Sequence, residues 1–160
     1  MTAHHIAVLH AMHTCRDHLR TLVQQHPNNP IIYADAPAWR ISDVLGHIAF
    51  WEVEGTKSLM AHAQRTTYVT PQLRELQGDA INALVYAQLV QLPVPAQIAY
   101  ADACREAFVQ AISALDATAQ ATPMMCPWHV KANVASFLQN MYDHERNHLN
   151  DVLAVLKGSA

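Results

Sequence analysis

The residues best suited to chemistry in this 160-residue chain are two histidines four positions apart, His144 and His148. On a helix this spacing places the two side chains one turn apart on the same face, so that one rigid element offers two imidazoles to a metal ion. Glu145 lies between them and points partly inward. It is a candidate to orient an imidazole or to take a proton from a metal-bound water. Its alternative partners are Arg146 or a neighbouring helix.

A third ligand is needed for a metal site of this kind, and His47 is the best candidate. It lies about seven residues, or ~10 Å, into a predicted helix, at the edge of an apolar stripe beside Trp51. His144 and His148 lie a comparable distance from the end of the last predicted helix. If the two helices are antiparallel neighbours, the three imidazoles meet at one level. The pattern therefore predicts a divalent-metal site with open coordination positions, which is typical of catalysis.

The elements that must position these side chains are helices, because apolar residues recur with the helical period and no convincing strand pattern is present. We predict four long helices, at residues 3–25, 40–64, 96–119 and 132–157, with Gly158 just past the last one. A connection of ~30 residues between the second and third is long enough to cross back along the bundle, and it carries a short helix at 79–92. Segments 31–38, 66–78 and 122–128 are predicted loops. We therefore expect a single all-α domain over residues 1–160, an up-down-down-up four-helix bundle.

The composition excludes several classes of protein. Hydrophobic residues make up 51% of the chain and charged residues 14%, as in a globular protein. A net charge of -3 without a basic run argues against nucleic-acid binding, and no window is apolar enough for a transmembrane helix. Cys15, Cys104 and Cys126 are widely spaced and indicate reduced thiols in a cytoplasmic protein. We also expect a homodimer formed through a helical face.

Two segments resemble a known family. Residues 39–52, WRISDVLGHIAFWE, resemble the second-helix motif of the DinB-like (YfiT-like) superfamily, and residues 142–149, YDHERNHL, resemble its fourth-helix motif. The resemblance implies an up-down-down-up bundle with a divalent metal on three side chains, here His47, His144 and His148. Arg40 stands where a Ser or Thr helix cap is common. Activities in the superfamily include thiol-dependent transfer, isomerisation and some hydrolytic reactions.

The expected function is therefore that of a metal-dependent enzyme, either a thiol-dependent transferase or a hydrolase, acting on a small molecule. Zinc or nickel is the expected metal, with a low-molecular-weight thiol as a possible second cofactor. One alternative is a non-catalytic metal-binding or small-ligand-binding protein, and another is a bundle whose inward histidines are hydrogen-bonded. His144, Glu145 and His148 also match the zinc-peptidase motif H-E-x-x-H, but no His or Glu follows them as a further ligand.

Other residues are candidates to surround the site. Helical spacing places His18, and Tyr100 or Asp102, at the level of the three histidines, where they could line a pocket. Trp128 is expected to pack over one end of the bundle. The remaining histidines in and just after the first helix mostly fall off its apolar face and are expected to be solvated: His4, His5, His10, His13 and His26.

Overall fold

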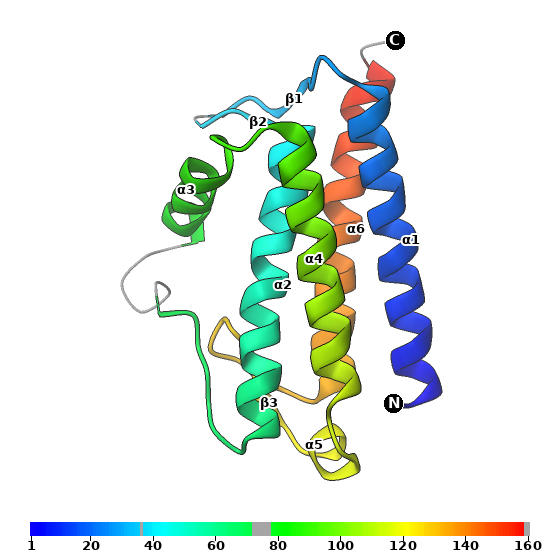
Figure 1. Ribbon diagram of the computed structural model, residues 1–160, viewed down its shortest axis with the longest axis vertical. Coiled ribbons are helices and arrows are strands. Elements are labelled where there is room, and N and C mark those ends of the chain that lie inside the picture. The colour runs from blue at the N-terminus through cyan, green and yellow to red at the C-terminus, as the bar shows by residue number, and fades with distance from the viewer. Residues whose placement is uncertain (36, 72–77, 159–160) are drawn as a thin grey trace.

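The computed structural model describes residues 1–35, 37–71 and 78–158. Along the chain, the first long helix ascends in Figure 1, the next two descend and the last ascends. The predicted all-α, up-down-down-up bundle is confirmed. Neither these helices nor any other described helix is long and apolar enough to cross a membrane. The long helices are α1 (Ala3–Gln25), α2 (Ile41–Ala63), α4 (Val94–Ser113) and α6 (Val134–Gly158).

The smaller elements depart from the predicted pattern. Four short strands, which the sequence pattern did not reveal, form two antiparallel pairs, β1 with β2 and β3 with β4. Strands of two or three residues are too short to show a period in the sequence. The predicted loop at 66–78 falls partly on residues 72–77, which lie outside the described residues. The smaller elements are β1 (Ile31–Tyr33), β2 (Trp39–Arg40), α3 (Gly78–Leu89), α5 (Ala117–Ala121), β3 (Met124–Met125) and β4 (Lys131–Ala132).

Several helix ends also differ from the prediction, most of all the end of the third long helix. The third long helix ends at Ser113 because Asp116 caps a separate helix, α5, by accepting a hydrogen bond from the backbone N–H of Ala119. The last helix includes Gly158, which was predicted to lie just beyond it. Such one-residue differences are usual where helix ends fray.

The start of α2 is fixed without a Ser or Thr cap. The Asp43 carboxylate accepts a hydrogen bond from the backbone N–H of Arg40 at 2.9 Å. Asn29, from the loop before β1, accepts one from the backbone N–H of Ser42 at 3.2 Å. These bonds satisfy amide donors that the first turn of a helix leaves free, and Asp43 also complements the helix dipole. They therefore fix the residue at which α2 begins, and with it the depth of His47 along the helix.

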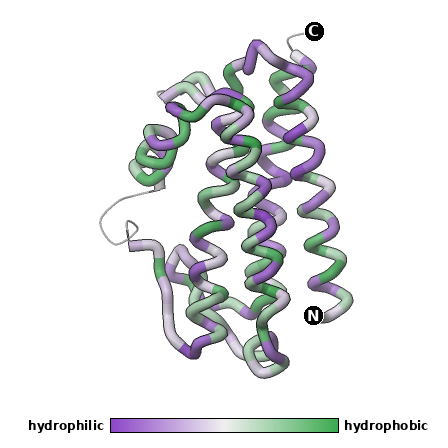
Figure 2. The backbone as a smooth tube through the Cα atoms, in the orientation of Figure 1, coloured by the Kyte–Doolittle hydropathy of each residue, from purple (hydrophilic) through white to green (hydrophobic). Residues whose placement is uncertain are grey.

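Apolar and polar residues alternate along each long helix, and the apolar faces meet in the bundle interior (Figure 2). The helix α2 packs most extensively against α4, and α1 against α6.

At Gly55 of α2 the absence of a side chain allows two phenylalanine rings to approach the helix backbone closely. A Cβ atom there would lie 2.9 Å from Phe108 of α4 and 3.0 Å from Phe137 of α6. His5 of α1 is also part of the interior, 3% exposed, so its predicted exposure to solvent was wrong.

A ring of four buried charges crosses the middle of the bundle, with one residue from each long helix. Arg16 of α1 lies 3.0 Å from both Glu52 of α2 and Glu145 of α6. Arg105 of α4 bonds the other oxygen of each carboxylate, at 2.5 Å to Glu52 and 2.6 Å to Glu145. Arg16 also donates to the backbone carbonyl of Ala101 at 2.8 Å. Charge balance and multiple hydrogen bonds allow these groups to be buried, and they hold four helices in register.

Candidate metal centre

The three histidines singled out by the sequence lie together. His47 of α2 and both His144 and His148 of α6 direct ring nitrogens toward a common point. The Nε2 atom of His144 is 3.1 Å from Nε2 of His47 and 3.1 Å from Nε2 of His148. One ligand atom from each ring lies within 4.8 Å of the others. Nitrogen atoms bound to one tetrahedral zinc ion are about 3.3 Å apart, so the spacing suits a single ion.

The hydrogen bonding of these rings fits a cation at their centre. An imidazole nitrogen carries either one proton or one lone pair, so Nε2 of His144 can form a good hydrogen bond with only one of its two neighbours. The third ring nitrogen then faces the centre without a hydrogen-bond partner. The outer nitrogen of His47, Nδ1, is buried and has no hydrogen-bond partner among the described residues. A divalent ion would accept the three lone pairs together, and imidazole nitrogen is a common donor to divalent transition metals.

Burial keeps the three imidazoles uncharged near neutral pH. Desolvation, with repulsion from His144, lowers the pKa of His148 to about 4. Desolvation and the two neighbouring imidazoles lower the pKa of His47 well below its usual value. Desolvation also lowers the pKa of His144, against the opposing effect of Glu145. Since protons do not compete for these nitrogens at pH 7, their lone pairs are available to a metal.

An aromatic cavity of about 500 Å³ opens beside the three histidines. All three tryptophans of the chain line it, namely Trp39 of β2, Trp51 of α2 and Trp128. The rings of Trp51 and Trp128 meet edge to face with centroids 6.4 Å apart. Asn82 of α3 and Asn140 of α6 add amide groups to the wall. Apart from the histidines, the described lining residues carry no ionisable side chain, so the cavity suits an uncharged, ring-shaped or unsaturated group.

A second hollow of about 430 Å³ adjoins the first and is more acidic. The two share Trp39, Asn82 and His148. Asp35 and Asp79 are among the residues that line the second hollow. His148 therefore stands between an aromatic cavity and a more polar one.

Glu145, the predicted catalytic residue, lies next to His144 in sequence but takes part in the ring of buried charges. Its side chain is 0% exposed, and each carboxylate oxygen accepts a hydrogen bond from a guanidinium group, Oε1 from Arg16 and Oε2 from Arg105. The alternative partner on a neighbouring helix is therefore the one observed, while Arg146 pairs with Asp143. Glu145 is absent from the lining of the aromatic cavity, among the described residues.

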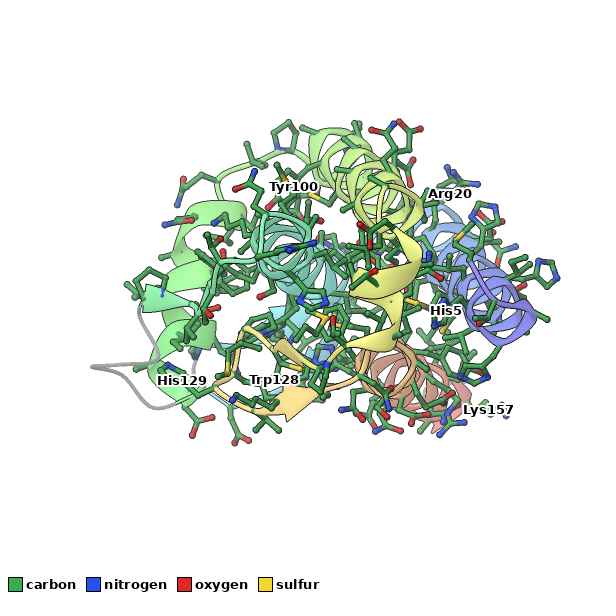
Figure 3. The ribbon with its side chains drawn as sticks, turned by 90° about the horizontal axis from the view of Figure 1, so that it is seen from below. His5, Arg20, Tyr100, Trp128, His129 and Lys157 are labelled. Atoms are coloured by element: carbon green, nitrogen blue, oxygen red, sulfur yellow. The ribbon has the colours of Figure 1, made fainter. Side chains whose placement is uncertain are left out.

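The other predicted pocket residues lie elsewhere. His18 is exposed on α1, and Asp102 pairs with Arg20 at 3.4 Å. Seen from the end of the bundle, Tyr100 and Trp128 lie on opposite sides of α2 (Figure 3). None of His18, Tyr100 and Asp102 lines the aromatic cavity in the described structure, so their predicted pocket roles were wrong. The physical reason is that equal depth along a bundle does not specify which side of it a helix face covers.

Several residues around the site were missed by the sequence analysis. Tyr33 of β1 bonds the outer nitrogen of His148, and Asp151 bonds the same hydroxyl. Asn82 and Trp128 enter the cavity from α3 and the turn between β3 and β4. One available signal was the His148–Asp151 spacing, since residues three apart share a helix face. Tyr33 and Trp128 gave no comparable signal, because they approach from irregular segments far away in the sequence.

The fold and the histidine cluster define a class: this is a helical bundle of the DinB-like (YfiT-like) kind, a class of metal-binding helical domains. Residues 8–144 match the sequence profile of the mycothiol maleylpyruvate isomerase N-terminal domain. The chain belongs to this family. The match includes His47 and ends at His144, and His148 follows one turn later. Comparisons with curated proteins and with solved structures gave no match.

Proposed function

We propose that this protein is a divalent-metal-dependent enzyme that transfers a low-molecular-weight thiol to a small electrophilic substrate. The observation that carries the proposal is the convergence of three uncharged imidazole Nε2 atoms beside a cavity large enough for a small molecule. Three protein ligands leave a further coordination position, the arrangement found in catalytic zinc sites. A zinc or nickel ion held there would lower the pKa of a bound thiol or water and so supply the nucleophile.

The cavity supports a thiol mechanism over one that needs a protein base. Glu145 is held by Arg16 and Arg105, and the described cavity lining offers no carboxylate. In the proposed reaction the thiol loses its proton to solvent, and its sulfur bonds to the β-carbon of an unsaturated carbonyl compound. The carbon–carbon π bond breaks in this step, and the α-carbon takes up a proton from solvent. His47, His144 and His148 fix where the sulfur is held. The family's name, which refers to a mycothiol-dependent isomerase, also favours thiol chemistry.

The aromatic wall supports an uncharged, ring-containing or unsaturated acceptor. Trp39, Trp51 and Trp128 present large flat surfaces that bind such groups by stacking and edge contacts. The amides of Asn82 and Asn140 can donate hydrogen bonds to a carbonyl oxygen on the substrate. These side chains would orient the electrophilic carbon toward the histidines, which is how a binding site lowers a reaction barrier.

The test combines metal analysis with a thiol assay, using untagged wild-type protein, His148→Ala and the surface variant His10→Ala. We expect about one equivalent of zinc in wild type and His10→Ala, and none in His148→Ala. Zinc-loaded protein should then consume a thiol such as mycothiol in the presence of an unsaturated carbonyl compound. Absence of bound metal after incubation with zinc and with nickel would contradict the proposal.

Two other outcomes separate the alternatives. Bound zinc with ester hydrolysis but no thiol consumption would indicate a hydrolase. Bound zinc with neither activity would indicate a non-catalytic metal-binding or ligand-binding protein.

The expected cytoplasmic location and homodimer are part of the proposal. Burial of the three free thiols, Cys15, Cys104 and Cys126, supports a reducing compartment, and sedimentation would measure the oligomeric state.

A further inference from the structure

A chain of hydrogen bonds leads outward from the histidine cluster through a tyrosine to a carboxylate. The Nδ1 atom of His148 lies 2.8 Å from the hydroxyl oxygen of Tyr33. The same hydroxyl lies 2.7 Å from Oδ2 of Asp151, one turn further along α6. Tyr33 comes from β1, 115 residues before His148, so the contact joins two distant parts of the chain.

The chemistry of the three groups fixes the direction of both hydrogen bonds. An ionised carboxylate only accepts, so the Tyr33 hydroxyl donates its proton to Asp151. The tyrosine oxygen then accepts a proton from Nδ1 of His148. This selects the tautomer of His148 that carries its proton on Nδ1, and Nε2 is left with a free lone pair. That nitrogen is the one directed at His144 and the centre of the cluster.

Tyr33 also restricts the orientation of the imidazole ring. The rings of Tyr33 and His148 meet edge to face with centroids 5.9 Å apart, and Tyr33 packs in the same way on Trp39 at 6.1 Å. Burial and the hydrogen bond to Asp151 raise the pKa of Tyr33, so the hydroxyl keeps its proton at neutral pH. By contrast, Nδ1 of His47 has no partner among the described residues.

We propose that Tyr33 is a positioning residue of the metal site, and that Asp151 acts on His148 through it. The inference rests on the metal-binding part of the proposed function. Outer partners of this type hold a ligand histidine in its binding tautomer and orientation, and their loss typically weakens metal affinity 10–100-fold. It also gives the strand pair β1 and β2 a role, since Tyr33 and Trp39 bring this pair to the edge of the site.

The first test measures the zinc dissociation constant by competition with a chromophoric chelator. We expect Tyr33→Phe, which keeps the ring and removes the hydroxyl, to raise the constant about 10–100-fold. Asp151→Asn should raise it less, and adding Asp151→Asn to Tyr33→Phe should have little further effect, because Asp151 acts through the hydroxyl. The control is Tyr142→Phe, also partly buried and two residues before His144, whose hydroxyl forms no hydrogen bond within the described part of the chain.

The second test follows the His148 tautomer by ¹⁵N NMR in the metal-free protein at one neutral pH. Wild type and Tyr142→Phe should show the proton on Nδ1, and Tyr33→Phe should shift population toward Nε2. An unchanged tautomer, or zinc constants within twofold of wild type in a folded Tyr33→Phe protein, would overturn the inference. Because the NMR experiment uses no metal, it still decides the role of Tyr33 if the wild-type protein binds no zinc.

Discussion

The guanidinium Nε of Arg16 lies 3.0 Å from a carboxylate oxygen of Glu145, a residue 129 positions later in the chain. With Glu52 and Arg105 they form a closed ring of alternating charge inside the bundle. The next residue back, His144, faces the metal cluster instead. One turn of α6 therefore contributes both to the structural centre of the bundle and to its candidate site.

Removing the Glu145 charge should destabilise the protein strongly. In Glu145→Gln, two buried guanidinium groups retain only one carboxylate, and an uncompensated buried charge costs about 3–5 kcal/mol. Urea unfolding should show this loss. The control is Asp143→Asn on the same helix, whose pair with Arg146 is 38–49% exposed and should contribute less than about 1 kcal/mol. Equal stability of the two variants, with loss of activity only in Glu145→Gln, would instead support the catalytic role first predicted for Glu145.

Zinc should raise the thermal stability of the protein through the three histidines. A ligand that binds only the folded state, at a concentration 100 times its dissociation constant, raises the free energy of unfolding by about 2.7 kcal/mol. For a domain of this size that corresponds to a rise in Tm of about 5–10 °C. Differential scanning calorimetry should show the rise in wild type and in His10→Ala, and its loss in His47→Ala. A rise that persists in His47→Ala would place zinc elsewhere on the protein.

The stability of the metal-free protein should fall as the pH drops from about 6.5 toward 4. Burial lowers the pKa of His148 to about 4, whereas the unfolded chain takes up this proton near 6.5. Between these values the unfolded state binds more protons, so acid favours unfolding. The lowered pKa of His148 alone accounts for a loss of up to about 3 kcal/mol in the free energy of unfolding. Unfolding of His148→Gln, compared with wild type across this range, should show a flatter dependence on pH, and an identical dependence would refute the assignment.

Adding a methyl group at Gly55 should destabilise the bundle. The Cβ of Gly55→Ala would lie 2.9 Å from Phe108 and 3.0 Å from Phe137, both fully buried. Overpacking of this kind costs about 1–3 kcal/mol, which exceeds the helix propensity gain of about 1 kcal/mol. Gly158→Ala is the matched control, since a Cβ there meets nothing within 4 Å. Chemical denaturation should show a lower stability for Gly55→Ala only; equal values would mean that the aromatic rings move aside.

The sequence by itself was sufficient for the presence and order of the four long helices and for the three histidines. The bounds of α1 agree with the prediction, because a long apolar stripe ended by Pro27 leaves little choice. His144 and His148 follow from local geometry, since a four-residue spacing on one helix fixes two side chains relative to each other. His47 required the further step of aligning two helices by depth, and this succeeded because long bundle helices run nearly parallel to a common axis.

Only the tertiary structure decided which partner each polar side chain has. Glu145 lies one residue from a candidate ligand, yet the rotation of α6 directs it to Arg16 and Arg105. Tyr33 reaches His148 from a strand too short to leave a pattern in the sequence. The apolar periodicity of a sequence indicates the helix face on which a residue lies, because that face is set by the local backbone geometry. The identity of the atoms opposite that face depends on how distant segments pack, and this is a property of the whole fold.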